Sequence, residues 1–214
     1  EEAWKKIGNV ELHTRSAVSR VVIQGGKVTG VVSGDQNYTA DAYVCAVPFE
    51  RLATVLPEHK LDLSPFEHSP ITGIHLWFDR PVTNLAHATL LDRTIQWMFN
   101  KDQGRYVQLV VSASRNLTEM PRADVIALAV RELAEFFPIA AEAKLEKAHV
   151  VKEVRATFSA KPNLEAARPE SRTEIPNLFL AGDWTRSGWP ATMEGAVRSG
   201  YLAAESVAAS LGKA

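Results

Sequence analysis

Hydrophobic and polar positions near the start of the chain follow the two-residue period of β-strands. Residues 10–12, 18–23 and 28–32 are short runs rich in β-branched residues, and we expect three short strands there. Gly25 and Gly26 separate the second run from the third, and two adjacent glycines favour a hairpin turn. The pattern therefore predicts a β-meander.

A buried strand and a short helix are predicted after the meander. Residues 41–47 form a mostly apolar run that ends at Pro48. Residues 49–56 have the composition of a short helix, and Pro57 stops it because proline lacks the N–H that a continuing helix needs.

The central part of the chain predicts more strands and one long helix. Residues 71–78 alternate over their full length, so this strand has either both faces covered or one face turned to a hydrophobic cavity. From 61 to 70 the chain is expected to be a loop. Residues 121–137 carry an apolar stripe at helical spacing, which Pro138 closes. The further strand candidates are residues 90–91, 95–99, 106–112 and 145–158, with a hairpin turn at Asp102, Gln103 and Gly104.

The C-terminal part predicts a strand, a tight turn and a helix. Residues 178–181 read as a strand covered on both faces. Gly182 has no Cβ, so a ligand can approach its backbone, and Asp183 presents an acceptor beyond the end of the strand. A helix is expected to begin between Pro190 and Met193, and its N-terminus favours negative charge on a ligand. Its predicted apolar face consists of Met193, Val197, Gly200, Ala204, Val207 and Leu211. An ordinary αβ unit that closes a domain would show the same periodicity.

Composition and charge exclude several classes of protein. The 214 residues carry a formal net charge of −1, which provides no basic field for nucleic acid. No apolar run approaches the ~18 residues of a membrane span, although peripheral contact with the inner membrane face stays open. The single cysteine, Cys45, excludes an internal disulfide, suits a cytoplasmic location and is expected to be a small buried hydrophobe. The six histidines show no metal-ligand spacing, so we expect no metal site.

The C-terminal stretch resembles the flavin motif of the flavin amine oxidase and phytoene desaturase superfamily. Gly182-Asp183-Trp184-Thr185, the run from Gly188 to Val197 and Ser199-Gly200 are most similar to the squalene-associated FAD-dependent desaturases, the hydroxysqualene dehydroxylases. Residues 40–48, which read Ala-Asp-x-x-Val-x-Ala-x-Pro, fit the same resemblance.

This resemblance implies an α/β (mixed α+β) fold. The chain would be the C-terminal half of a two-domain FAD-dependent amine oxidase or desaturase. Residues 1–57 and 155–214 would belong to the FAD-binding domain, and residues 58–154 would form a substrate lobe of mixed sheet and helix. No Gly-x-Gly-x-x-Gly follows a strand in this sequence, so we expect the partner of this chain to be a missing N-terminal half that holds the ADP part of FAD.

The resemblance also implies which residues bind the cofactor. Val18 would meet the adenine, unless it is plain core, and Ala46 and Pro48 would flank the adenosine. Gly182 and Asp183 would lie at the pyrophosphate and the ribityl chain. The segment that would meet the flavin ring consists of Trp189, Pro190, Ala191, Thr192 and Met193, with the N–H groups near Thr192 and Met193 at its edge. Trp184 and Trp189 could each wall the flavin or simply pack.

No catalytic side chain is identified. The resembled family transfers hydride with few side-chain acids or bases, so the catalytic residues stay unknown. His75, in the strand predicted at 71–78, could face a substrate cavity or could be a core histidine with its polar atoms satisfied.

By resemblance, the substrate is a long isoprenoid and the reaction is the reductive dehydroxylation of hydroxysqualene to squalene in hopanoid synthesis. Carotenoid-type desaturation of phytoene and amine oxidation are the alternatives. FAD would be non-covalent, because no cysteine lies near the C-terminal motif. A reading of another class is an inactive fragment that binds FAD weakly or not at all and packs on the missing half or on itself as a homo-oligomer.

Overall fold

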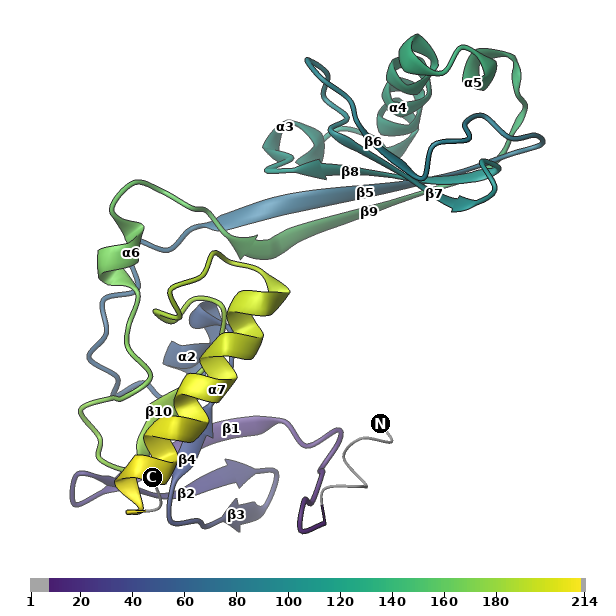
Figure 1. Ribbon diagram of the computed structural model, residues 1–214. Coiled ribbons are helices and arrows are strands. Elements are labelled where there is room, and N and C mark those ends of the chain that lie inside the picture. The colour runs from purple at the N-terminus through teal and green to yellow at the C-terminus, as the bar shows by residue number, and fades with distance from the viewer. Residues whose placement is uncertain (1–7, 213–214) are drawn as a thin grey trace. The chain divides into compact units, whose positions relative to one another are not determined.

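The computed structural model describes residues 8–212, so residues 1–7 and 213–214 of the predicted FAD-binding segments lie outside it (Figure 1). The chain separates into two compact units. The two-segment unit contains the chain up to Pro65 and from Pro162 onward, and the sheet unit contains Phe66–Lys161. Both boundaries fall later than the predicted ones after residues 57 and 154. At the second boundary the reason is that the last strand of the sheet unit continues to Phe158, where it pairs with His68.

The two-segment unit begins with a three-stranded antiparallel sheet, β1 (Val18–Gln24), β2 (Lys27–Ser33) and β3 (Gln36–Tyr38). The turn between β1 and β2 has Gly25 and Gly26 at positive φ, 59° and 76°, which confirms the predicted hairpin. The prediction of a strand at residues 10–12 is wrong. Val10 and Leu12 are exposed there, and the third strand is instead polar β3, whose three residues are all exposed and carry no apolar pattern to detect.

Two segments far apart in the sequence form the second sheet of this unit. Strand β4 (Tyr43–Cys45) pairs in parallel with β10 (Leu178–Leu180). Both lie within predicted strands, β10 is buried as expected, and β4 is only partly buried. The side chain of Asn177 ties β10 to the meander, since Val28 N donates to Asn177 Oδ1 over 2.9 Å and Asn177 Nδ2 donates back to Val28 O over 2.8 Å. In the described part of this unit the helices are α2 (Phe49–Val55), α6 (Leu164–Ala167) and α7 (Met193–Ser210).

Helix α7 begins within the predicted window but buries a different face from the one expected. Its buried residues are Gly195, Ser199 and Ala203, whereas Met193 is 89% exposed and Val197 is 55% exposed. The physical reason is close approach: the Oγ of Ser199 accepts a 2.7 Å hydrogen bond from the backbone N–H of Gly182, which only small residues permit. The predicted stripe of larger apolar residues points away from this contact.

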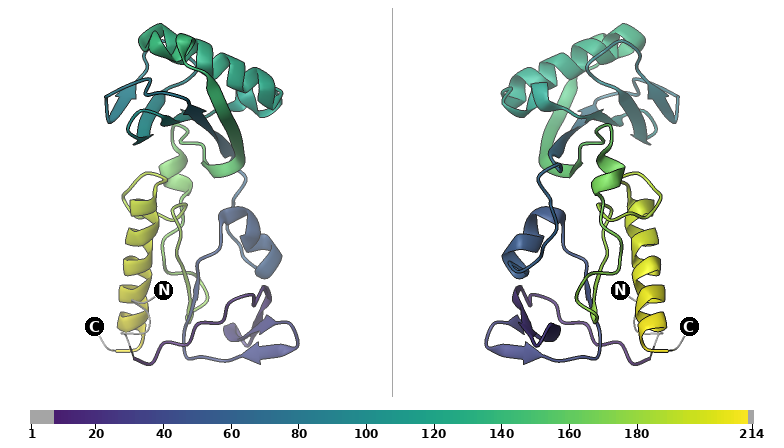
Figure 2. Two further views of the ribbon diagram at one scale, coloured as in Figure 1. Left: turned by 90° about the vertical axis from the view of Figure 1, so that its right-hand side faces the viewer. Right: turned by 90° about the vertical axis from the view of Figure 1, so that its left-hand side faces the viewer.

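The sheet unit is an antiparallel sheet with strand order β6-β7-β8-β5-β9. Its strands are β5 (His68–Phe78), β6 (His87–Thr89), β7 (Trp97–Asp102), β8 (Tyr106–Ser112) and β9 (Leu145–Phe158). Helices α3 (Arg115–Thr118), α4 (Arg122–Phe136) and α5 (Ile139–Glu142) lie on one side of this sheet (Figures 1 and 2). The core lies between α4 and the sheet and includes Ile74, Leu76, Met98, Leu109, Val125, Ala129, Leu133 and Val150.

Several predictions for the sheet unit hold, and others are wrong. Strand β9 spans the predicted residues, α4 lies within the predicted helix, and the expected turn carries Gln103 and Gly104 at positive φ. The predicted loop is partly strand, because β5 already begins at His68. Pro70 is tolerated there because the pairing of β5 with β9 has an irregularity between Ser69 and Ile71, where no N–H is needed. The pair predicted at 90–91 lies just after β6, and the four-residue helices α3 and α5 were not expected.

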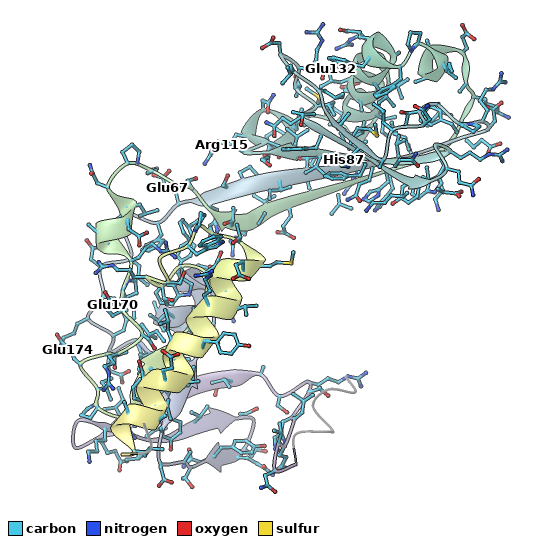
Figure 3. The ribbon with its side chains drawn as sticks, in the orientation of Figure 1. Glu67, His87, Arg115, Glu132, Glu170 and Glu174 are labelled. Atoms are coloured by element: carbon cyan, nitrogen blue, oxygen red, sulfur yellow. The ribbon has the colours of Figure 1, made fainter. Side chains whose placement is uncertain are left out.

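Glu132 is a buried polar residue within this core. It is 6% exposed, and its Oε2 accepts a 2.8 Å hydrogen bond from the backbone N–H of Ile95, in the segment before β7 (Figure 3). A buried carboxyl oxygen needs such a donor, so Glu132 links α4 to the segment that leads into β7.

Candidate functional site

The fold brings together two parts of the predicted cofactor site that are far apart in the sequence. Because β4 and β10 are parallel, their carboxyl ends meet at one edge. The N–H of Ala181 donates to Cys45 O over 3.0 Å, and the indole Nε1 of Trp184 donates to Val47 O over 2.9 Å. The segment with Ala46 and Pro48 therefore lies beside the turn that follows Gly182.

Glycine is required at position 182. Gly182 has a φ of 137°, and a Cβ there would stand 2.6 Å from Nε1 of Trp184. Trp184 is itself 1% exposed and is held by its hydrogen bond to Val47. Of its two predicted roles, the structure therefore supports packing for Trp184, which fills the space beside the turn.

Asp183 is half-buried directly after this turn. Burial raises the pKa of its carboxyl group, and the positive charge of Arg168 acts in the opposite direction. Asp183 thus lies at the carboxyl edge of the β4–β10 sheet, and its role as an acceptor for a ligand stays a prediction.

Arg168 holds the loop that carries the motif, and sequence reasoning missed it. Its side chain is 4% exposed and donates to the carbonyl oxygens of Asp183 (2.8 Å), Trp189 (2.9 Å) and Thr185, and to Oε2 of Glu165 (2.6 Å). Arginine suits this role because its planar group carries five N–H donors in a fixed fork. Arg168 lies in a polar segment that contains several prolines, and such segments are usually exposed to solvent, so the local sequence did not indicate that this arginine is buried.

The entry to helix α7 is built from short polar contacts. Thr192 is the N-cap, and its Oγ1 accepts a 3.1 Å hydrogen bond from the N–H of Gly195. A Cβ on Gly195 would stand 2.4 Å from Pro190 O, so the loop can close onto the helix only at a glycine. Trp189 is 41% exposed and lies under the guanidinium of Arg198, whose carbon is 4.3 Å from the ring centroid. Pro190 and Thr192 are exposed and Ala191 is half-buried, so the predicted flavin-facing segment forms an accessible rim.

Val18 and Ala46 line one cavity of about 310 Å³ at the junction of the meander and β4. Val18 is 42% exposed, which excludes the alternative that it is plain core. Pro48 lies outside the lining of this cavity and forms the N-cap position of α2. Cys45 also lines the cavity. Burial raises the pKa of its thiol, so it is an inert buried residue, as predicted.

In the sheet unit, His75 lies on the face of the sheet opposite the core. It is partly exposed, and its Nδ1 lies 2.8 Å from the hydroxyl oxygen of Tyr106. His75 is therefore not a core histidine. Within residues 8–212, no group of three or more His, Cys, Asp or Glu side chains is arranged to hold a metal, and no helix is long and apolar enough to cross a membrane.

Comparison with known proteins places these features in a family. Residues 1–208 match the model of the family described as flavin containing amine oxidoreductase. The chain is 38% identical over 165 residues to a hydroxysqualene dehydroxylase of Sinorhizobium fredii, a match that covers 77% of this chain and 38% of that protein. It is 33% identical over 228 residues to a 15-cis-phytoene desaturase of an Oncidium hybrid cultivar, covering 96% of this chain and 38% of that protein.

Solved structures share the fold at low sequence identity. An oxidoreductase from Methanosarcina mazei superposes with a TM-score of 0.67 at 16% identity, over 90% of this chain and 49% of that chain. A structure from Exiguobacterium sp. gives a TM-score of 0.65 at 11% identity, over 92% of this chain and 47% of that chain. The chain spans less than half the length of each of these relatives. Its match over residues 1–208 shows that it belongs to the flavin containing amine oxidoreductase family.

Proposed function

We propose that this chain is part of an FAD-dependent oxidoreductase that acts on a long isoprenoid, and that the reaction is the reductive dehydroxylation of hydroxysqualene to squalene. The observation that carries the proposal is the 38% identity to a hydroxysqualene dehydroxylase, which spans most of this chain. The geometry of the flavin motif supports it. A glycine turn, a half-buried acceptor and a capped helix N-terminus lie close together in the sequence, and one buried arginine, Arg168, binds three carbonyl oxygens of the loop between the turn and the helix.

The residues present fit FAD. The cavity lined by Val18 and Ala46 offers apolar contact to an adenine. We assign the pyrophosphate to the backbone of Gly182 and Asp183 on the side that the Trp184 ring does not fill. The first N–H groups of α7 and its positive dipole end favour the negative edge of a flavin near Thr192. When bound, FAD supplies hydride transfer. The chain's own contribution is to bind and orient it, and we expect this binding to be non-covalent.

We further propose that this chain alone holds FAD weakly and that a separate N-terminal half supplies the remaining contacts. This proposal is supported by the solvent exposure of the residues assigned to the cofactor. Three of the residues assigned to the cofactor, Val18, Trp189 and Met193, are between 41% and 89% exposed. A ligand covered on one side only loses much of the desolvation that makes electrostatic contacts strong.

The test is an absorption spectrum of the purified chain, alone and after addition of FAD and desalting. We expect little retained flavin from the chain alone, and a flavin band near 1:1 once a polypeptide carrying the glycine-rich N-terminal half of a relative is added. Asp183→Asn should weaken the complex severalfold, because the acceptor becomes neutral, whereas Asp35→Asn, at an exposed site outside both motifs, is the matched control. If the combined polypeptides stay colourless, the flavin proposal is wrong.

A second candidate is a phytoene-type desaturase. The specific observation in its favour is coverage, because the similarity to a 15-cis-phytoene desaturase extends over 96% of this chain rather than 77%. Incubating hydroxysqualene with the complex that carries reduced FAD, and phytoene with the complex that carries oxidised FAD, distinguishes the two. The first would give squalene and water as reduced FAD supplies hydride, and the second would give a more unsaturated carotenoid as FAD takes up two hydrogens. Amine oxidation is a third possibility. It would be detected as hydrogen peroxide, which forms when oxygen reoxidises the flavin during turnover of an amine.

The partners and the location follow from the same proposal. We propose that the N-terminal half covers the exposed residues Met193, Val197 and Tyr201 of α7, and that the protein is cytoplasmic with peripheral contact to the membrane that stores its apolar substrate. Light scattering of the chain with and without the added half tests whether that half covers α7. A homo-oligomer that persists in the complex would contradict it.

A further inference from the structure

The face of the sheet opposite the core carries an aromatic surface, which the flavin motif does not explain. Residues 74, 76 and 78 of β5 face the core, so residues 73, 75 and 77 face the other way. On that face the rings of Trp77 and Tyr106 stack with centroids 4.5 Å apart and planes at 11°. Nζ of Lys147 lies 4.7 Å from the Trp77 centroid, and Trp97 and Phe99 extend the surface along β7.

A hydrogen-bonded pair interrupts this aromatic surface. Nδ1 of His75 and the hydroxyl oxygen of Tyr106 lie 2.8 Å apart, and the His75 ring also stacks on Trp77 at 6.1 Å and 23°. These contacts fix the orientation of the imidazole and leave Nε2 as its outer polar atom. Burial, and after it the electrostatic influence of the neighbouring His149 and Lys101, lowers the pKa of His75, so the ring is neutral near pH 7.

Nε2 of His75 lies beside a dent in the surface. Gly73 has no side chain, and its Cα partners on the two neighbouring strands are Val110 and Val151. A Cβ built on Gly73 would stand 3.7 Å from Nε2, and nothing else lies within 4 Å of it. Glycine in a strand interior often marks a place where another molecule approaches. The dent thus offers one polar nitrogen between two apolar side chains.

We propose that this dent binds the hydroxyl group of a long apolar substrate, with His75 as a specificity-determining residue and Tyr106 as the residue that positions it. A neutral imidazole nitrogen exchanges one hydrogen bond with a hydroxyl in either tautomer, since a hydroxyl both donates and accepts. The stacked rings and the two valines match the apolar remainder of such a molecule. This inference rests on the proposed isoprenoid function and deepens it, because it assigns the hydroxyl to named atoms of the chain.

The test compares two ligands that differ in one hydroxyl group. Hydroxysqualene and squalene, each in the same detergent micelles, are titrated into the full chain while tryptophan emission is followed, because Trp77 lies against His75. One net hydrogen bond corresponds to tighter binding of hydroxysqualene by roughly 2- to 13-fold. His75→Phe, which keeps an aromatic ring, should bring this ratio to about 1. Tyr106→Phe should lower it partially, since the imidazole remains but is no longer held.

Two further variants keep the result interpretable. Gly73→Ala fills the dent at an ordinary contact distance, so it should fold and should weaken hydroxysqualene binding selectively. His13→Phe is the matched control: His13 is exposed and belongs to the two-segment unit, outside the aromatic surface, so this variant should leave the ratio unchanged.

The outcomes separate this inference from the function on which it rests. If both ligands bind and the ratio is the same in wild type, His75→Phe and Gly73→Ala, the hydroxyl site is wrong while the isoprenoid function stands. If neither ligand saturates the wild-type chain, or if the surface proves to be covered by a second copy of the chain in solution, the inference is overturned. If neither ligand saturates the wild-type chain, the isoprenoid proposal is contradicted as well.

Discussion

Replacing Arg168 with methionine removes the donor that holds the motif loop while keeping much of the side-chain volume. Three carbonyl oxygens, those of Asp183, Thr185 and Trp189, lose a charged donor. A buried carbonyl without its partner costs about 1–3 kcal/mol. Because Trp189 is partly exposed, water can reach some of this loop, so we take the lower value for each carbonyl. The expected loss is about 3 kcal/mol in the free energy of unfolding, or roughly a hundredfold in the equilibrium constant.

Two companion variants test the reasoning behind this magnitude. Arg168→Lys should recover less than half of the loss, because a compact ammonium group cannot span carbonyls that two guanidinium nitrogens reach. Glu165→Gln should change stability by less than about 1 kcal/mol, because the Glu165 side chain is 58% exposed and its ion pair is screened by solvent.

The assay is urea unfolding followed by circular dichroism, with hydrogen exchange of the Trp184 indole N–H as a local probe. That proton is bonded to Val47 O, beside the loop. A loss of ~3 kcal/mol should shift the unfolding midpoint of the two-segment unit by roughly 1–3 M urea and speed the exchange. The sheet unit, Phe66–Lys161, should unfold as before and is the internal control. A shift under ~1 kcal/mol for Arg168→Met, or wild-type stability for Arg168→Lys, would refute the reasoning.

Three other predictions concern the turn, the core and the aromatic surface. Gly182→Ala should lower the free energy of unfolding by about 2–4 kcal/mol, because it adds backbone strain and overlaps with the buried Trp184 ring. Gly188→Ala, also at positive φ but in open space, should lower it by about 1–2 kcal/mol. Equal urea midpoints for the two variants would count against the steric argument. Leu133→Ala, fully buried against the sheet, should lower the stability of the sheet unit by about 2–5 kcal/mol, and Leu91→Ala, at a 68% exposed site, by less than about 0.5 kcal/mol in the same thermal unfolding assay. Burial lowers the pKa of His75, so an NMR titration of its ring should give a midpoint below 6.5. As the pH falls, the unfolded chain takes up this proton before the folded chain does. The contribution of neutral His75 to the free energy of unfolding is therefore complete above pH 6.5 and is lost as the pH falls through the folded pKa. A midpoint at or above 6.5 would contradict the burial argument.

The elements that sequence reasoning located well depend on local signals. Two adjacent glycines mark the β1–β2 turn, and long alternation marks β9 over its full length. The start of α7 was also recognisable, because Pro190 and the Thr192 cap act within a few residues of it. The flavin motif itself is contiguous, so its resemblance to a known family could be read from the chain and then was matched by a family model over residues 1–208.

The errors fall where the outcome depends on a partner that is distant in the sequence. Periodicity showed that α7 has an apolar stripe, but contact with the Gly182 turn decides that Ser199 and its small neighbours are buried instead. A polar strand such as β3 forms because β2 offers a free edge, and Pro70 enters β5 because the pairing with β9 is irregular there.

This contrast between local and long-range signals explains which features could be predicted and which required the folded structure. The order of residues determined the family and the set of candidate cofactor residues, because both are written in short contiguous motifs. The tertiary structure decided that Trp184 packs, that Arg168 carries the loop, and that Val18 and Ala46 share a cavity. These roles arise from burial and from hydrogen bonds between remote segments, and neither quantity can be read from a local pattern.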